Sequence, residues 1–245
     1  GGRAVTEGRF DTHSGQAAFE SGWRDMPPGE RTRLLRNLAK RIHENVETLA
    51  QLETRNVGKP IGDARWEADA GAKVFDYYAG AIGHLCGQTI PVARGGFDFT
   101  LRQPMGVIAA ITPWNFPFLI ACWKVAPALA AGNSVVLKPA SLTPLTALML
   151  GQLAQEAGLP DGVFNVVHGL GPAVGEPLCR HEDVQAISFT GGTATGVHVG
   201  QAAAESFKKI SLELGGKNAT IVFEDADLEE AAAGAARAAF ANQGQ

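Results

Sequence analysis

Two polar side chains of the 245-residue chain stand where apolar runs end and could take part in catalysis, one as a hydrogen-bond donor and one as a base. Asn115 lies in the rigid turn PWNFP, after the run GVIAAIT, and an amide held there can donate a hydrogen bond to a developing oxyanion. An asparagine that only shapes the turn is the alternative. Glu213 lies near the end of the run KISLEL, and in so apolar a setting we expect a raised pKa, as a general base needs. A buried glutamate paired with a neighbour is the alternative there.

Three further segments could hold a nucleotide. Lys138 ends the run SVVLKP, where its charge could bind a ribose hydroxyl or a phosphate, unless it is simply exposed. Gly191 and Gly192 follow the run VQAISFT and precede a helical stretch, which would bring phosphates close to backbone N–H groups; a tight turn is the alternative. The segment GLGPAVG lacks the G-x-G-x-x-G spacing of the dinucleotide fingerprint and is a weak signal alone.

All these segments follow short β-rich runs that alternate with helical ones. Near-continuous apolar strands alternating with helices predict an α/β fold, a doubly wound, Rossmann-like parallel sheet with helices on both faces. Ligands of such sheets bind beyond the carboxyl ends of the strands, so the polar segments should meet at one edge. The expected strands cover residues 106–112, 134–139, 162–169, 184–190 and 209–214, with helical stretches at 142–157 and 196–205.

Two helices and a hairpin are predicted ahead of this sheet. Apolar residues recur at three- and four-residue steps over residues 28–52, which indicates one amphipathic helix that ends near Gly58. A second helix is expected over residues 63–85. Residues 87–103 alternate around Gly95 and Gly96, which predicts a β-hairpin that we interpret as a projecting arm.

Composition and charge exclude several classes of protein. The net charge is −4 and no basic cluster is present, so a nucleic-acid partner is not expected. Prolines and Lys124 interrupt the longest apolar stretch, residues 114–131, which therefore does not predict a membrane span. Residues 1–15 lack the apolar core of a secretory signal, which favours a cytoplasmic protein.

Cysteine and histidine spacing argues against a disulfide framework and against a metal site. Cys86, Cys122 and Cys179 show no C-x-x-C pattern, and each is interpreted as a small buried apolar residue. The six histidines are scattered without i, i+4 pairs, so no metal ligands are predicted.

Six motifs, in chain order, resemble those of the NAD(P)-dependent aldehyde dehydrogenase superfamily: TPWNFP, WKVAPALAAGN, VVLKPAS, FTGGTATG, LELGGK and FANQGQ. The resemblance covers roughly residues 28–245. It implies oxidation of an aldehyde to a carboxylic acid, with hydride transfer to NAD or NADP. In that family a cysteine thiolate adds to the aldehyde, and a glutamate activates the water that hydrolyses the resulting thioester.

The resemblance implies roles for individual residues. Glu213 is the general base, Asn115 the amide that stabilises the oxyanion, and Lys138 the lysine that binds ribose. Ser141 stands where many NAD-preferring members have glutamate, and a serine does not repel a 2′-phosphate, so tolerance of NADP is a hypothesis. The implied cofactor-binding residues are Ile111, Thr112, Pro113, Trp114, Lys138, Ser141, Gly171, Gly175, Phe189, Thr190, Gly191, Gly192, Thr195 and Leu214.

The final segment FANQGQ leads, in that family, to the nucleophilic cysteine, which would lie two residues beyond Gln245. By resemblance none of the three cysteines of the chain can replace it. We therefore expect the chain to be the N-terminal, cofactor-binding portion of the enzyme, truncated before its nucleophile and inactive alone. The alternative is a non-catalytic protein of the same ancestry that binds a nucleotide or a partner. A coenzyme A-linked relative is a further alternative, which Glu213 disfavours.

The expected organisation has four parts. Residues 1–86 carry the N-terminal helices, 87–103 the oligomerisation arm, 104–216 the Rossmann-like cofactor domain, and 217–245 the start of an incomplete catalytic domain. In the last part, Asp227 and Glu230 match a helix N-cap and its reciprocal partner. The resemblance implies a homodimer or homotetramer that acts on a small aldehyde. A muconic-type semialdehyde is the leading substrate hypothesis, ahead of betaine-type and general aliphatic aldehydes.

Overall fold

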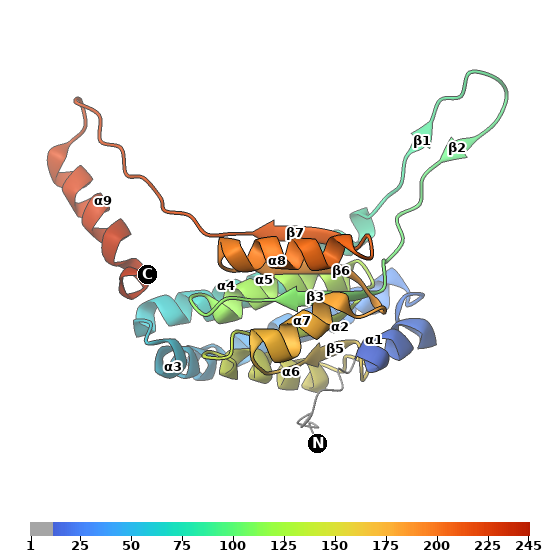
Figure 1. Ribbon diagram of the computed structural model, residues 1–245, viewed down its shortest axis with the longest axis horizontal. Helices are drawn as coiled ribbons and strands as arrows, with labels where there is room; N and C mark the ends of the chain where they lie inside the picture. Colours follow the sequence, from blue (N-terminus) through green and yellow to red (C-terminus); the bar gives the residue numbers. More distant parts are fainter. Residues whose placement is uncertain (1–11) are drawn as a thin grey trace.

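A parallel sheet of five strands lies at the centre of the protein. The computed structural model describes residues 12–245 (Figure 1). The strand order is β5-β4-β3-β6-β7, so the chain builds outward from β3 in one direction and then in the other. This order confirms the predicted doubly wound α/β fold. The strands are β3 (Val107–Ile111), β4 (Ser134–Lys138), β5 (Phe164–Val166), β6 (Val184–Thr190) and β7 (Lys209–Glu213).

The central strands differ sharply from the edge strand β7 in burial. All five residues of β3 and all five of β4 are buried. Ala109 of β3 lies opposite Val136 of β4 on one side and Ile187 of β6 on the other. All five residues of β7 are exposed, because this strand lies at the edge of the sheet.

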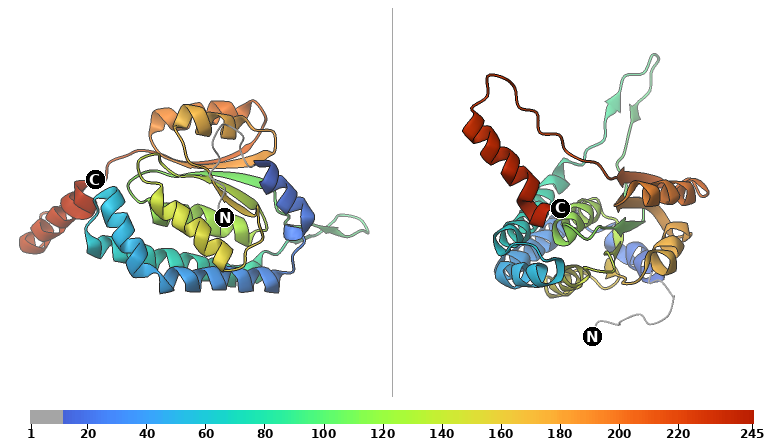
Figure 2. Two further views of the ribbon diagram at one scale, coloured as in Figure 1. Left: turned by 90° about the horizontal axis from the view of Figure 1, so that it is seen from below. Right: turned by 60° about the vertical axis from the view of Figure 1, so that its left-hand side comes forward.

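Helices cover both faces of the sheet (Figure 2). Helices α5 and α6 pack against β3, β4 and β5, and α2, α3 and α4 form a second layer over them, whereas α7 and α8 pack against β6 and β7. Alternate residues of β3 enter two separate apolar clusters, Ala110 with the first group of helices and Ala109 with the second, because successive side chains point to opposite faces. The helices are α2 (Pro28–Glu44), α3 (Val46–Val57), α4 (Ile61–Ala81), α5 (Pro117–Ala130), α6 (Leu145–Glu156), α7 (Glu176–Arg180) and α8 (Thr193–Ala204).

A short helix that the sequence patterns did not indicate lies at the amino ends of the strands. Helix α1 (Thr12–Ala18) continues into the π-helical turn η1 (Phe19–Trp23). The Trp23 indole donates a hydrogen bond to the Asn133 carbonyl at 2.9 Å, just before β4 begins. The Thr12 hydroxyl lies 2.7 Å from Nε2 of His181, just before β6. These contacts hold α1 against the amino edge of the sheet.

The single helix predicted over residues 28–52 is wrong, because the structure has two helices there. Helix α2 ends at Glu44 and α3 begins at Val46, with Asn45 between them at φ −111° and ψ 14°. The Asn45 side chain donates to the Arg41 carbonyl at 2.8 Å, an interaction that competes with continuation of the helix. Both helices bury apolar faces, so the periodicity conceals the break.

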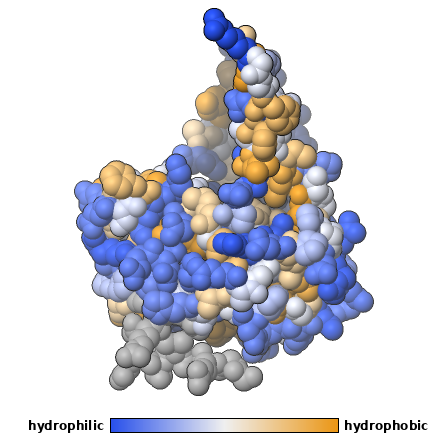
Figure 3. All heavy atoms as spheres, turned by 90° about the vertical axis from the view of Figure 1, so that its right-hand side faces the viewer, coloured by the Kyte–Doolittle hydropathy of each residue, from blue (hydrophilic) through white to orange (hydrophobic). Residues whose placement is uncertain are grey.

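The predicted hairpin is present and projects from the body of the protein (Figures 1 and 3). Strand β1 (Thr89–Ile90) pairs with β2 (Asp98–Phe99) in antiparallel register. Figure 3 shows apolar side chains along this arm and a hydrophilic tip. The exposed apolar side chains of the arm are Ile90, Val92, Phe97, Phe99 and Leu101.

An extended connection leads from β7 to the last helix, α9 (Leu228–Phe240), which buries none of its residues. Asp227 is the N-cap, as predicted, because its carboxylate accepts the backbone N–H groups of Glu229 and Glu230 at 2.9 and 3.1 Å. The 3-10 turn η4 (Ala241–Gly244) follows and brings the end of the chain back toward α3 and α4 (Figure 1).

The cysteines are not all buried, so the expectation for Cys86 is wrong. Cys122 and Cys179 are buried, whereas Cys86 is exposed where the arm leaves the turn η2 (Ile82–His84). Among the described residues, no helix combines the length and the apolar character that crossing a bilayer demands.

Candidate functional site

The structure brings the predicted polar segments together at the carboxyl edge of the sheet. Hydrogen bonds join neighbouring strand ends there: Thr112 N–H donates to the Lys138 carbonyl at 3.2 Å, and Gly191 N–H donates to the Glu213 carbonyl at 3.1 Å. The segments that follow β3, β4, β6 and β7 therefore start side by side. This is the edge at which doubly wound sheets bind ligands.

Lys138 is a buried lysine rather than an exposed one. Its residue is only 5% exposed, and burial lowers the pKa of its ammonium group. Nζ donates to the Pro139 carbonyl at 3.1 Å. A Cβ atom on Gly175 would lie 3.5 Å from Cδ of Lys138, so the turn η3 (Gly171–Gly175) lies directly over the lysine stem. A lysine so enclosed can direct its charge toward a ligand at the strand ends.

The glycines after β6 permit close packing at the start of α8. A Cβ atom on Gly191 would lie 2.6 Å from the Phe189 ring, and one on Gly196 would lie 2.3 Å from Leu214. No side chain caps the first turn of α8. Its backbone N–H groups are therefore available to an anionic ligand, and these donors together with Lys138 fit the phosphates and ribose of a dinucleotide.

Asn115 has one side of its amide fixed and the other directed at the last residues of the chain. Its Oδ1 accepts the Phe116 N–H at 3.1 Å, and its Nδ2 donates to Oε1 of Gln245 at 2.7 Å. The Asn115 carbonyl accepts from Nδ2 of Asn242 at 3.1 Å. The amide N–H that could stabilise an oxyanion thus faces the segment that resembles the lead-in to a catalytic cysteine.

The segment from Asn242 to Gln245 is also held by the turn between α3 and α4. Asn242 is buried, and its N–H donates to the Asp63 carboxylate at 3.3 Å. The Gln243 side chain donates to the Val57 carbonyl at 3.0 Å. Asn242 and Gln243 both have a φ of 49°, a left-handed conformation that these contacts maintain.

Glu213 does not have the apolar setting that its neighbours in sequence suggested. It lies on the exposed edge strand, where alternating apolar side chains such as Leu212 also remain accessible. Its Oε2 accepts the Thr190 hydroxyl at 2.9 Å. The carboxylate is therefore oriented by a hydrogen bond rather than by burial.

Lys124 also lies near the carboxyl edge of the sheet. In the sequence analysis it was noted only because it interrupts an apolar run. Its Nζ donates to the Ser188 hydroxyl of β6 at 2.9 Å. Burial lowers the pKa of Lys124 to about 8, an effect that the nearby charge of Glu213 opposes. The motif WKVAPALAAGN contained this residue, but no spacing argument connected it to Glu213.

A second group of charged side chains, missed entirely from the sequence, lies buried beneath the Asn115 turn. Lys59 and Glu67 form a buried ion pair. Glu67 also accepts the Leu119 N–H at 3.0 Å, in the first turn of α5, and Nζ of Lys59 lies 4.0 Å from the centre of the Phe116 ring. Burial and the charge of Glu67 raise the pKa of Glu53 to about 8. These contacts support the backbone that follows Asn115.

The remaining residues of the implied cofactor set lie along the same edge at various depths. Ser141 is half-buried, and its hydroxyl lies 3.4 Å from the Gly169 carbonyl. Trp114 is exposed, and Thr195 is exposed in the first turn of α8. Ile111, Thr112, Pro113, Gly171, Phe189, Thr190, Gly192 and Leu214 lie at the strand ends or in the loops that follow them.

Comparison with known proteins agrees with this geometry. The chain is 45% identical over 230 residues to 4-trimethylaminobutyraldehyde dehydrogenase of Bos taurus, covering 94% of this chain and 46% of that relative. The crystal structure of PnpE in complex with nicotinamide adenine dinucleotide matches with a TM-score of 0.93 and 47% identity, covering 96% of this chain and 48% of that one. An NADP-dependent enzyme of E. coli matches with a TM-score of 0.93 and 43% identity, covering 96% of this chain and 49% of that one.

The chain spans about half the length of the relatives it matches. The model of the aldehyde dehydrogenase family matches residues 12–245. Together with the identity and the shared fold, this match shows that the chain belongs to the aldehyde dehydrogenase family.

Proposed function

We propose that the chain binds NAD or NADP at the carboxyl edge of its sheet and contributes this site to an enzyme that oxidises an aldehyde to a carboxylic acid. The observation that carries the proposal is the contact of Asn115 with Gln245 and Asn242. This contact joins the amide assigned to the oxyanion with the segment that leads to the nucleophile in the family. The substrate hypothesis is a semialdehyde or another small aliphatic aldehyde.

Cofactor binding is supported by two groups of donors and by the absence of negative charge at Ser141. Lys138 would hold a ribose hydroxyl, and the uncapped N–H groups at the start of α8 would hold phosphate oxygens. Ser141 adds no negative charge near the ribose, so we infer that NADP is accepted as well as NAD. The bound nicotinamide would supply the hydride acceptor.

The chain's own residues would act on the reacting carbonyl and on water. Asn115 would donate its amide N–H to the oxyanion once Gln245 moves away. Glu213 would take a proton from the hydrolytic water, and the Thr190 hydroxyl on Oε2 would leave its other oxygen free for that proton. The nucleophile would come from a family-type catalytic segment that follows the chain.

The activity can be tested in a polypeptide that carries the chain together with such a catalytic segment. With an aldehyde panel that includes semialdehydes and 4-trimethylaminobutyraldehyde, we expect steady NADH formation. Glu213→Gln should lower steady-state turnover by about 10²–10⁴-fold while retaining one rapid NADH burst per site, because only hydrolysis needs the base. Glu224→Gln, an exposed carboxylate on the following segment, is the matched control. Absence of NADH from the unmodified protein would favour a non-catalytic role, and a requirement for coenzyme A would favour the acylating alternative.

Cofactor choice can be tested on the chain itself by fluorescence titration with NAD and NADP. Ser141→Glu should weaken NADP binding by at least tenfold, on the order of 1.4 kcal/mol, because a carboxylate repels the 2′-phosphate. Leu142→Glu adds the same charge one residue away at an exposed position and should leave both affinities unchanged. Equal loss of NADP affinity in both variants would contradict the role of Ser141.

We further infer that residues 87–103 mediate assembly into a homodimer or homotetramer, because apolar side chains line the projecting arm (Figure 3). Sedimentation velocity of the complete enzyme tests this inference.

The cytoplasm, a reducing compartment, suits the three free thiols and is the location we propose.

A further inference from the structure

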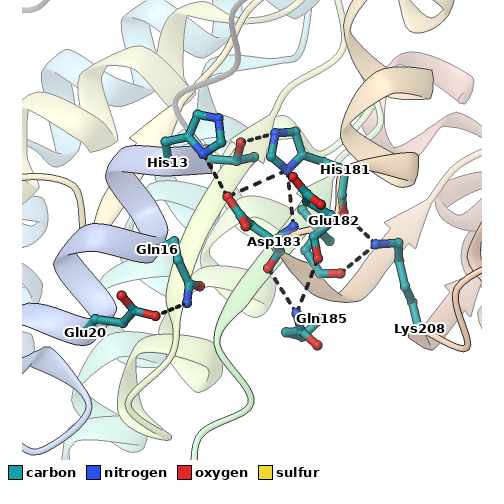
Figure 4. A network of polar contacts seen from close by, with 10 residues as sticks. His13, Gln16, Glu20, His181, Glu182, Asp183, Gln185 and Lys208 are labelled. Carbon is teal, nitrogen blue, oxygen red and sulfur yellow. Dashed lines mark hydrogen bonds and ion pairs between the residues drawn. The ribbon is translucent and has the colours of Figure 1, made fainter.

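A compact group of metal-ligating side chains lies at the amino edge of the sheet, on the side opposite the proposed cofactor site. His181 and Asp183 stand in the loop just before β6, and His13 stands in the first turn of α1. Figure 4 shows both imidazole rings and the carboxylate pointing toward one another. One ligand atom from each of the three residues lies within 4.8 Å of the other two.

We propose that His13, His181 and Asp183 bind one divalent transition-metal ion of the zinc type. Two imidazole nitrogens and one carboxylate oxygen form a common ligand set for zinc, with water completing the coordination. Tetrahedral coordination at zinc's usual bond lengths separates neighbouring ligand atoms by about 3.3 Å. Here Oδ2 of Asp183 lies 3.0 Å from Nδ1 of His13 and 3.9 Å from Nδ1 of His181. Small side-chain movements would therefore complete the site.

The His181 ring is already held in the orientation that a metal requires. Its Nε2 lies 2.7 Å from the hydroxyl of Thr12, which is fully buried, and the Asp183 backbone N–H donates to Nδ1 at 3.3 Å. These two contacts favour the tautomer with the proton on Nε2, which leaves the lone pair on Nδ1 facing Asp183. A hydrogen bond from the second ring nitrogen is the usual support of a metal-bound histidine, and the long N–H contact at Nδ1 is the one a metal would replace.

The loop that carries two of the ligands is fixed by its neighbours. Nζ of Lys208 donates to the His181 carbonyl at 2.6 Å and to the Val184 carbonyl at 2.7 Å. The Gln185 side chain donates to the carbonyls of Glu182 and Asp183, each at 3.4 Å (Figure 4). The third ligand, His13, has a side chain that is 78% exposed and can move to meet an ion.

The charges around the site permit a cation. Asp183 and Glu182 contribute negative charge, and Lys208, whose ammonium group is occupied by two carbonyls, opposes it in part. Metal binding would replace the present contact between His13 and Asp183 and tie α1 to the loop before β6.

The test is a Zn²⁺ titration of the tag-free 245-residue chain against a chromophoric chelator, with Co²⁺ absorption as a second probe. Every protein carries Cys86→Ser, which removes the exposed thiol as a competing ligand. We expect one ion per chain and a visible Co²⁺ spectrum. His13→Gln and Asp183→Asn should each weaken Zn²⁺ binding by at least about tenfold. Both substitutions are conservative, and His13 is exposed, so the fold should persist.

The matched control is His198→Gln. The His198 ring contacts the Glu176 carboxylate on the surface, but no third ligand joins them among the described residues. This variant should bind Zn²⁺ as the Cys86→Ser protein does. NMR signals of the His13 and His181 rings should shift on saturation, and the signal of His198 should not. The proposal is overturned if no ion binds at about 1 mM Zn²⁺, because a site with a Kd of about 1 mM would be half filled at that concentration. It is equally overturned if His13→Gln and Asp183→Asn bind as tightly as the control.

Discussion

Two regions of the molecule hold carboxyl groups in opposite environments. Beneath the Asn115 turn, Glu53 and Glu67 are buried with Lys59, whereas Glu213 lies on the exposed edge strand β7. The buried region contains the carboxyl group whose pKa is raised, Glu53, and the exposed region contains the one that resembles the family's general base. The buried setting that the sequence analysis expected for Glu213 is therefore found at Glu53, a residue that the sequence did not single out.

This contrast shows that an apolar sequence does not by itself make an apolar environment. Leu212 and Leu214 flank Glu213, yet all three are exposed, because within residues 12–245 no further strand pairs with the outer edge of β7 and only α8 packs against this strand. Glu53 lies on a helix with charged neighbours in sequence, yet it is only 2% exposed because α6 and α4 pack over it. Burial is decided by the packing of whole elements.

The largest effect in the buried region should come from breaking the ion pair between Lys59 and Glu67. Glu67→Ala leaves a buried ammonium group without its partner and removes the acceptor of the Leu119 N–H. We expect a loss of about 3–5 kcal/mol in the free energy of unfolding. Urea denaturation followed by circular dichroism measures this loss.

Two variants sharpen the measurement. Glu67→Gln keeps an acceptor for Leu119 but removes the charge, so it separates the hydrogen bond from the ion pair. Glu213→Ala removes a carboxylate from the exposed strand and should change stability by about 0.5 kcal/mol or less. Similar losses for Glu67→Ala and Glu213→Ala would show that the two regions do not differ energetically.

The next effect concerns pH and belongs to Glu53. Its pKa is about 8 in the folded protein against an ordinary value of 4.5. Below pH 4.5 the group is protonated in both states, and between 4.5 and about 8 only the unfolded state ionises. Glu53 therefore destabilises the folded state increasingly as pH rises through this range. The destabilisation reaches its full value above about pH 8.

Glu53→Gln should remove this decline and raise stability at pH 8 relative to pH 5 by a few kcal/mol. The measurement is the urea midpoint of both proteins across this pH range. Glu156→Gln, an exposed carboxylate on α6, is the control and should leave the pH dependence unchanged. A parallel pH dependence in Glu53→Gln and the unmodified protein would mean that Glu53 ionises normally when folded.

The strands of the sheet could be predicted because the sequence signals of buried parallel strands are local. The strand runs predicted at 184–190 and 134–139 match β6 and β4 almost residue for residue, since buried parallel strands are short apolar runs bounded by turns. The break at Asn45 was missed, because a single polar residue interrupts two helices that share one buried face. Helix α1 was missed because THSGQAA has no stripe of large apolar residues.

The candidate site also contains some residues that local sequence signals reveal and others that they do not. Lys138 and Gly191 were found because Lys138 ends β4 and Gly191 directly follows β6. The proximity of Lys124 to Glu213 instead depends on how α5 packs against the sheet. The contact of Asn115 with Gln245 joins residues 130 positions apart. His13 and His181 are separated by a similar length of chain, so spacing could not have indicated that they meet.

The smallest expected effect tests whether the exposed helix α9 unfolds independently of the buried region. Asp227 caps α9, which buries none of its residues, so the helix contributes little to the core. Asp227→Ala should cost about 1 kcal/mol of local helix stability, because two backbone N–H groups lose their acceptor. Hydrogen exchange of the α9 amides should accelerate about fivefold, while the urea midpoint of the whole chain stays constant.

Asp225→Ala, on the same exposed connection, is the control and should alter neither quantity. A lower urea midpoint in Asp227→Ala would mean that α9 unfolds together with the buried region. The turn from Asn242 to Gln245 would then transmit that coupling, through its bonds to Asp63 and Asn115.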